Sequence, residues 1–176
     1  MDYESKFTVF TDGSALNNKA NAPAGWAVYI PSVKRLLSKS MIGTNNQAEL
    51  EAMRYALWFI GRHLNDFDVV DKIVYIFSDS EYVINSLTGK WKINENLAKI
   101  RACQTLMKKL TDEGYKVEFI HAKAHTKKKD FISLNNDIVD QEARRKANET
   151  KSTNLSGNIV QQFIPNDEEF DPSLDY

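Results

Sequence analysis

Two aspartates follow stretches of sequence that favour β-strands. Asp12 comes directly after residues 7–11, and Asp79 follows residues 73–77 inside a Ser-Asp-Ser turn. If these two strands are parallel neighbours, both carboxylates emerge side by side at the carboxyl edge of a sheet. This edge is where α/β proteins commonly place their functional sites. The pattern therefore predicts that Asp12 and Asp79 belong to one site.

Two further carboxylates are predicted to join this site from helices. Glu49 lies in the first turn of a helical pattern that begins near Asn46, and Asp140 lies on a predicted final helix, one turn after Asn136. Clustered carboxylates repel one another unless cations neutralise them, and oxygen-only ligand sets suit hard ions such as Mg²⁺. Two such ions about 4 Å apart can activate a water and stabilise the leaving oxygen in phosphodiester hydrolysis. The four residues together favour that chemistry.

Three of the four carboxylates also have an ordinary structural explanation. An aspartate before glycine often forms a turn, which would account for Asp12. Glu49 stands three residues after Asn46, as in a capping box. Asp140 fits a solvated helix face. The hypothesis of a site depends on their combination.

The elements expected to position these residues describe a layered α/β domain. Strands are expected over residues 7–11, 25–30, 35–41, 72–77 and 117–121. Short links between the first three favour an antiparallel meander. Helices are expected over residues 46–64, 81–87, 95–112 and 137–148, with a polar loop over 127–136. Strands and helices in this order are typical of a sheet covered by helices.

Composition narrows the possible classes of protein. The chain has 176 residues, 42% of them hydrophobic, which is enough to form a core and excludes a wholly disordered chain. Residues 151–176 contain one cation and five anions, so the remaining body is mildly basic and permits a nucleic-acid partner. The single cysteine, Cys103, excludes an internal disulfide framework and a Cys-rich zinc site. No signal peptide and no apolar run of about 20 residues is apparent, which predicts a cytoplasmic protein without membrane association.

Five short motifs follow one another along the chain. They are Thr11-Asp12-Gly13-Ser14, Thr44-Asn45-Asn46-Gln47-Ala48-Glu49-Leu50, Ser78-Asp79-Ser80, His125, and Asn136 to Asp140 with Glu142-Ala143. In these motifs and their order the chain resembles the type 1 ribonucleases H over about residues 5–149. The resemblance implies a catalytic domain over 1–149 and an acidic C-terminal tail over 150–176. It also implies a three-layer α/β ribonuclease H-like fold, with a five-stranded mixed sheet of order 3-2-1-4-5 flanked by helices.

The same resemblance implies an activity and a set of catalytic residues. Members of the family cleave the RNA strand of RNA–DNA hybrids without sequence preference, leaving 5′-phosphate and 3′-hydroxyl ends. The implied cofactor is Mg²⁺, two ions per site, for which Mn²⁺ can substitute. Asp12, Glu49, Asp79 and Asp140 match the metal-binding carboxylates. His125 matches a loop histidine thought to help product release or proton transfer, although a plain surface histidine explains it equally simply.

Contacts with the hybrid are likewise implied by the resemblance. The positions that match are Gly13, Ser14, Thr44, Asn45, Asn46, Tyr82, Trp91 and Asn94. Groups near Gly13, Asn45 and Glu49 would contact the RNA 2′-hydroxyl, which DNA lacks. Thr44 and Asn94 match a pocket for a DNA phosphate, and Asn94 would also serve as a helix N-cap. Tyr82 and Trp91 match aromatic residues that flank DNA sugars, and both would also fit as core aromatics.

Two departures from the family concern affinity for the hybrid. The stretch from Trp91 to Asn94 leaves almost no room for the basic protrusion that many members carry there. The loop after His125 is instead longer and contains Lys127, Lys128 and Lys129. We expect a low intrinsic affinity that the lysines raise in part by releasing counterions.

Other functions and other roles of the tail stay open at this point. A nuclease for another duplex and a non-catalytic hybrid-binding module would share the fold. The protein is expected to be a monomer. The tail could be a solubilising segment, a peptide that docks on a protein partner, or, through residues 159–164, a part of the folded body.

Overall fold

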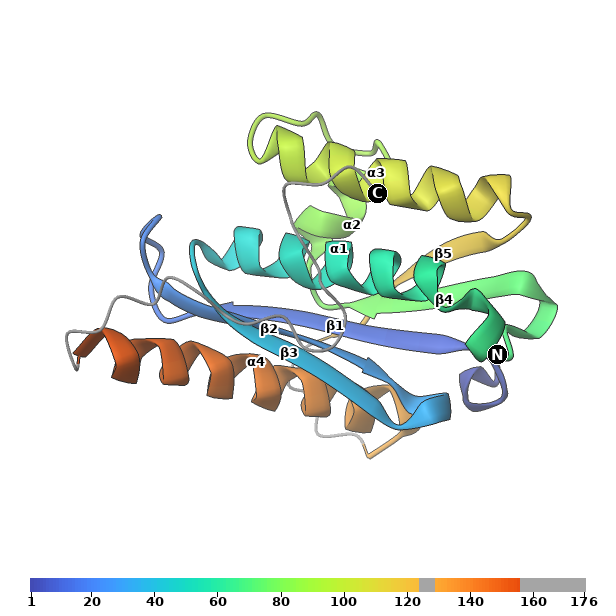
Figure 1. Ribbon diagram of the computed structural model, residues 1–176, viewed down its shortest axis with the longest axis horizontal. Coiled ribbons are helices and arrows are strands. Elements are labelled where there is room, and N and C mark those ends of the chain that lie inside the picture. The colour runs from blue at the N-terminus through green and yellow to red at the C-terminus, as the bar shows by residue number, and fades with distance from the viewer. Residues whose placement is uncertain (124–128, 156–176) are drawn as a thin grey trace.

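The computed structural model describes residues 1–123 and 129–155. Its five strands are β1 (Thr8–Ala15), β2 (Pro23–Ile30), β3 (Arg35–Ile42), β4 (Ile73–Ser78) and β5 (Lys116–His121). The α-helices of the described residues are α1 (Asn45–Arg62), α2 (Glu81–Leu87), α3 (Leu97–Asp112) and α4 (Phe131–Leu155). The strand order is β3-β2-β1-β4-β5. The first three strands are antiparallel and the pairs β1/β4 and β4/β5 are parallel, which confirms the expected mixed sheet (Figure 1).

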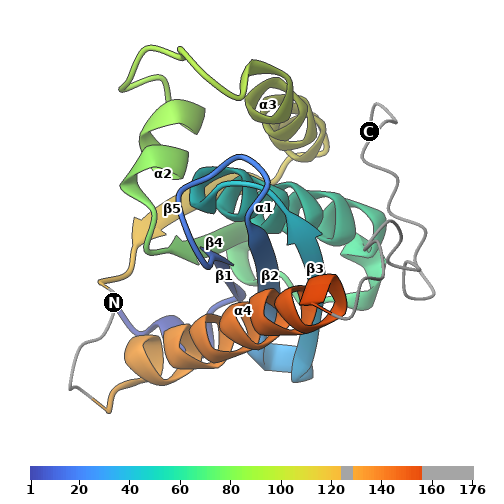
Figure 2. The same ribbon diagram turned by 90° about the vertical axis from the view of Figure 1, so that its left-hand side faces the viewer.

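The sheet lies between two layers of helices. Helix α4 covers one face, while α1 covers the other, with α2 and α3 on the same side (Figures 1 and 2). On the α1 side, Leu50, Met53 and Leu57 are fully buried against the sheet. On the α4 side, the rings of Phe10 and Phe77 stack with centroids 4.6 Å apart. Apolar packing on both faces thus fixes β1, which contains Asp12, and β4, which Asp79 follows directly.

Helix α1 begins one residue earlier than the sequence pattern suggests and has a different cap. The Thr44 hydroxyl accepts a hydrogen bond from the Gln47 backbone N–H at 3.1 Å, and the Gln47 side chain accepts from the Thr44 N–H at 2.9 Å. This capping box satisfies two N–H groups of the first turn. The prediction that Asn46 and Glu49 form the capping box was therefore wrong. Because Glu49 does not cap the helix, its carboxylate is available for another role.

Helix α4 is longer than predicted at both ends. It begins at Phe131, so the polar loop expected over 127–136 was wrong for residues 131–136. The Asp130 carboxylate accepts from the Ser133 N–H at 2.8 Å and thereby caps the first turn. At its other end α4 crosses residue 150 and reaches Leu155. The division into residues 1–149 and 150–176 stays a prediction.

Close contact between α4 and β2 depends on a glycine. A Cβ atom at Gly25 would lie 2.5 Å from the Ala143 carbonyl oxygen and 2.7 Å from the Ala147 nitrogen. Only glycine allows the helix backbone to approach the strand so closely. This contact sets the height of α4 above the sheet, and with it the position of Asp140.

Helix α3 begins after a residue other than the one predicted. Its N-cap is Asn96, in the left-handed region at φ 55°, and not Asn94. The N-cap explanation of Asn94 was therefore wrong. Across the described ranges, 1–123 and 129–155, none of the helices is long and apolar enough to cross a membrane.

Candidate active site

Three carboxylates from three elements meet at one end of the sheet. Asp12 comes from β1, Asp79 follows β4 directly, and Glu49 lies in the first turn of α1. Each offers an oxygen such that the three atoms lie within 4.8 Å of one another. The parallel pairing of Thr11 with Ser78 brings the two aspartates to neighbouring positions, as the sequence predicted. Asp12 lies inside β1 and not at a turn, so the turn explanation of Asp12 was wrong.

These carboxylates line an open cavity of about 600 Å³. The residues of the described chain that line it are Asp12, Gly13, Ser14, Ala15, Leu16, Asn45, Glu49, Asp79, Ser80, Asp140, Arg144 and Asn148. Asp140 reaches this cavity from α4 but lies outside the compact group of three. Its carboxylate accepts a hydrogen bond from Arg144 Nε at 3.2 Å, and its side chain is mostly shielded from solvent. Asp140 is therefore not a fully solvated charge on the helix face, and that explanation of the residue was wrong.

Burial gives the cluster unusual acid–base properties. Asp12 and Glu49 are 3% exposed, and this desolvation raises the pKa of each carboxyl well above its usual value. Repulsion from the neighbouring Asp79 raises both pKa values further. Burying like charges together is costly unless protons or cations compensate them. The site is therefore built to take up positive charge.

A divalent cation fits the donor atoms that are present. Glu49 Oε2 is buried and has no hydrogen-bond partner among the described residues. Buried polar atoms in native proteins are nearly always satisfied, so such an atom indicates a missing partner. An oxygen-only group of three carboxylates is a ligand set that Mg²⁺ or Mn²⁺ accepts. The residues thus fit the metal that the sequence led us to expect.

The single cysteine does not offer a competing nucleophile. Cys103 is fully buried in α3, and burial raises the pKa of its thiol to about 12. A thiol in that environment stays protonated and unreactive near neutral pH.

Residues expected to contact RNA surround the carboxylates. Gly13, Ser14 and Asn45 line the cavity. The Asn45 side-chain oxygen accepts from the Ala15 N–H at 3.2 Å and so ties the start of α1 to the end of β1. Asn46 is partly exposed and lies outside the cavity lining.

Of the residues expected to contact the DNA strand, Thr44 is the N-cap of α1, whereas Tyr82, Trp91 and Asn94 lie on and after α2. Tyr82 is partly buried, and its hydroxyl donates to the Glu95 carbonyl at 3.3 Å and accepts from the Asn96 side chain at 3.0 Å. Trp91 is 48% exposed, so the core explanation was wrong for this tryptophan. Asn94 is exposed. None of the three lines the acidic cavity.

Several residues of the predicted site lie outside the part of the chain that the structure describes. His125, Lys127 and Lys128 fall outside the described residues, and so do residues 159–164 of the C-terminal region. Lys129 is described and is exposed.

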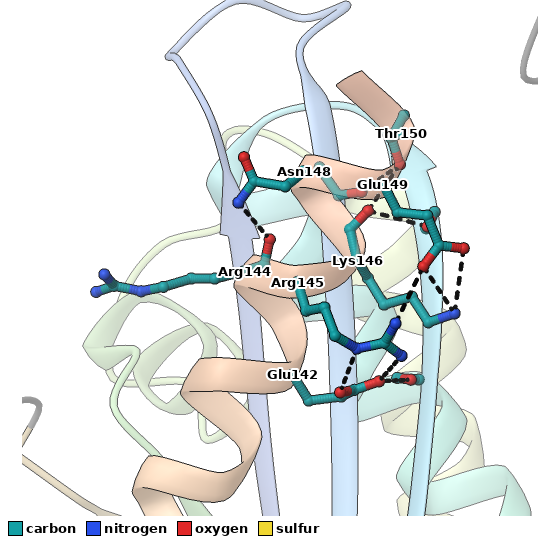
Figure 3. Close-up of polar contacts among 10 residues, drawn as sticks. Glu142, Arg144, Arg145, Lys146, Asn148, Glu149 and Thr150 are labelled. Atoms are coloured by element: carbon teal, nitrogen blue, oxygen red, sulfur yellow. Dashed lines mark hydrogen bonds and ion pairs between the residues drawn. The ribbon is translucent and has the colours of Figure 1, made fainter. Parts of the chain in front are cut away.

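Five residues of the cavity wall were not predicted from the sequence: Ala15, Leu16, Ser80, Arg144 and Asn148. Arg144 follows Asp140 by four residues and Asn148 follows Arg144 by four, so all three share one face of α4. The Asn148 amide donates to the Arg144 carbonyl at 2.9 Å (Figure 3). The signal in the sequence that points to Arg144 and Asn148 is their helical spacing from Asp140, which gives their shared face of α4.

Comparisons with known proteins agree with this architecture. The family model described as RNase H matches residues 4–148. A ribonuclease H of Tropheryma whipplei (strain Twist) is 43% identical over 91 residues, which are 52% of this chain and 50% of that protein. A ribonuclease H of Nitratidesulfovibrio vulgaris (strain DP4) is 36% identical over 87 residues, covering 48% and 49% of the two chains. The chain thus spans about half the length of the curated relatives it matches.

Solved structures show the same fold. RNase H1 from the halophilic archaeon Halobacterium salinarum NRC-1 superimposes with a TM-score of 0.57 at 22% identity, covering 82% of this chain and 99% of that one. LC11-RNase H1, solved in complex with an RNA/DNA hybrid, superimposes with a TM-score of 0.61 at 24% identity, covering 83% of this chain and 99% of that one. Together with the matching family model, these findings establish that the chain belongs to the RNase H family.

Proposed function

We propose that this protein is an endonuclease that hydrolyses the RNA strand of RNA–DNA hybrids without sequence preference. The observation that carries the proposal is the meeting of Asp12, Glu49 and Asp79 in one open cavity, with two of them buried. Membership of the RNase H family supports it. The expected products carry 5′-phosphate and 3′-hydroxyl ends.

Asp12, Glu49, Asp79 and Asp140 are the residues that would hold Mg²⁺ in this proposal, two ions per site, with Mn²⁺ as a substitute. Bound there, the ions would supply an activated water and stabilise charge on the leaving oxygen. The protein's own contribution is to hold the carboxylates together against their repulsion. The rigid pairing of β1 with β4 and the capped first turn of α1 provide this preorganisation.

Recognition of RNA is assigned to the rim formed by Gly13, Ser14, Asn45 and Asn46. The 2′-hydroxyl both donates and accepts hydrogen bonds, and main-chain and amide groups at this rim can do the same. Because the Asn45 side-chain oxygen is held by Ala15, its amide nitrogen has a fixed direction. This rim would distinguish RNA from DNA at the strand to be cleaved.

The other strand would be held farther along the molecule. Tyr82 and Trp91 would flank DNA sugars, and Thr44 with Asn94 would bind a DNA phosphate. Lys127, Lys128 and Lys129 would add electrostatic attraction for the hybrid. We also propose that the protein is a monomer and that its acidic tail binds a protein partner.

One assay tests substrate and activity together. The full chain is incubated with Mg²⁺ and labelled RNA–DNA hybrid, single-stranded RNA, duplex RNA or duplex DNA of one sequence. We expect cleavage of the hybrid alone, at several positions along its RNA strand. Preferred cleavage of another duplex would instead favour a related nuclease. Binding of the hybrid without cleavage would favour a non-catalytic module.

A further inference from the structure

One cation lies in the wall of the acidic cavity. Arg144 on α4 is the only lysine or arginine among the described residues that line it. Its Nε donates to Asp140 Oδ1 at 3.2 Å, while its side chain is 54% exposed. The guanidinium is thus anchored at one edge of the cavity and accessible to a molecule that enters.

The next residue in the chain provides a direct contrast. Arg145 donates to the Glu142 carboxylate at 2.9 and 2.6 Å and to Glu149 at 3.3 Å. Figure 3 shows its side chain within this network, while Arg144 extends away from it. Arg145 is exposed to a similar extent, 59%, yet it does not line the cavity. The exposed fractions of the two arginine side chains are therefore similar, but only Arg144 faces the cavity.

A guanidinium at this position matches the chemistry of the proposed substrate. Its planar set of N–H donors fits phosphate oxygens, and it keeps its charge at all physiological pH values. The four carboxylates Asp12, Glu49, Asp79 and Asp140 make the cavity acidic, and a cation in its wall adds to the positive charge that a phosphate needs there. We propose that Arg144 binds a phosphate of the RNA strand next to the bond that is cleaved, while Asp140 holds the arginine in place. This inference rests on the proposed function.

A purely structural role predicts different behaviour. An Asp–Arg pair four residues apart stabilises a helix, and losing it would lower the melting temperature without altering contacts with phosphate. A phosphate contact instead changes the salt dependence of binding. Each phosphate that a protein neutralises contributes about 0.9 to the slope of log affinity against log salt concentration. The slope therefore separates the two roles.

The experiment compares variants in an Asp12→Asn background, which is designed to bind the hybrid without cleaving it. Binding of a fluorescent RNA–DNA hybrid is measured over a series of KCl concentrations with Mg²⁺ present. We expect Arg144→Ala to lower the slope by about one unit and to weaken binding at low salt. Arg145→Ala should leave the slope unchanged. Arg144→Lys, which keeps the charge, should retain the slope of the parent.

Thermal melts establish that each variant is folded, and Arg144→Gln replaces Arg144→Ala if the alanine variant is not. Equal slopes for the parent and the folded, uncharged Arg144 variant would overturn the inference, whatever the change in melting temperature. Cleavage of the hybrid by the wild-type chain is measured in parallel. If the wild-type chain does not cleave, the proposed function fails and the inference fails with it. If it cleaves while the slopes coincide, only the role of Arg144 is refuted.

Discussion

Gly13 lies directly against the backbone of Glu49. A Cβ atom at position 13 would come within 2.3 Å of the Glu49 nitrogen and 2.4 Å of the Ala48 carbonyl carbon. Real Cβ atoms essentially never approach backbone so closely, and these backbone atoms cannot turn aside as a side chain could. The absence of a side chain at Gly13 is therefore what lets α1 bring Glu49 beside Asp12.

Gly13→Ala should force β1 and α1 apart and disturb the acidic cluster. Overpacking of this kind commonly costs about 1–3 kcal/mol. We expect a lower melting temperature and a loss of hybrid cleavage that persists when the protein is folded. Gly61→Ala is the matched control, because the nearest heavy atom to its added Cβ is 3.9 Å away and alanine favours a helix. Normal activity and stability in Gly13→Ala would contradict the close contact.

The metal-free protein should lose stability as the pH rises. The pKa values of Asp12 and Glu49 are raised in the folded state, so the folded protein binds protons that the unfolded chain has already released. Stability contributed by these groups is therefore greatest in mild acid and falls as pH rises through the raised pKa values. Asp12→Asn removes one buried charge, so it should melt at a higher temperature than wild type in EDTA at neutral pH.

Mg²⁺ should reverse this difference. Melting temperatures of wild type and Asp12→Asn are measured between about pH 5 and pH 8, with EDTA and with Mg²⁺. The difference between the two proteins isolates the cluster from other titrating groups. We expect Mg²⁺ to stabilise wild type increasingly as the pH rises and to affect the variant much less. A wild-type protein that is indifferent to Mg²⁺ throughout this range would be inconsistent with a metal site.

The carboxylates and the loop histidine should differ in importance. Asp79→Asn should reduce turnover by several orders of magnitude, because the charge that holds a metal is lost. His125→Ala should cost roughly 10- to 100-fold, as expected when a proton-transfer group is removed. Asp112→Asn makes the same chemical change in an exposed ion pair with Lys108 and should have no effect. A histidine effect as large as that of Asp79 would require another mechanism.

The end of α4 should matter for stability, while the residues after it should not matter for catalysis. Thr150 is buried, and its hydroxyl bonds to the Ala24 carbonyl of β2 at 3.1 Å, which fastens the helix to the sheet (Figure 3). Truncation after Leu155 should leave hybrid cleavage within a few-fold of the full chain. Truncation after Ala147 removes Thr150 and should lower the melting temperature. Loss of activity in the protein truncated after Leu155 would show that the acidic segment takes part in the function.

The fold and the central aspartates were predictable because they depend on local patterns. The apolar run before Asp79 and the alternation before Asp12 each identify a strand, and parallel pairing of these two strands brings the aspartates together. The end of the first strand was not predicted, because β1 continues past Asp12 to Ala15. Helix boundaries were less predictable. The N-cap of α1 is Thr44, although Asn46 is also a residue type that favours this position. Asp130 caps the first turn of α4 within a stretch whose polar composition suggested a loop.

The part of the cavity wall that α4 forms beyond Asp140 could not be predicted without the tertiary structure. Arg144 looks like any solvated residue of a charged helix, and only the packing of α4 on β2 turns it toward the carboxylates. The position of Asp140 depends on the same packing. Helical periodicity gives the face that these residues share, but not the element that this face meets.

The most direct test of the account follows both strands of one hybrid. RNA and DNA strands carry different 5′ labels, and cleavage by the wild-type chain is followed with Mg²⁺, with EDTA, and with Asp12→Asn in Mg²⁺. We expect RNA fragments with 3′-hydroxyl ends in the first reaction, an intact DNA strand throughout, and no measurable cleavage in the other two reactions. Cleavage that continues in EDTA, or an Asp12→Asn protein as fast as wild type, would contradict it.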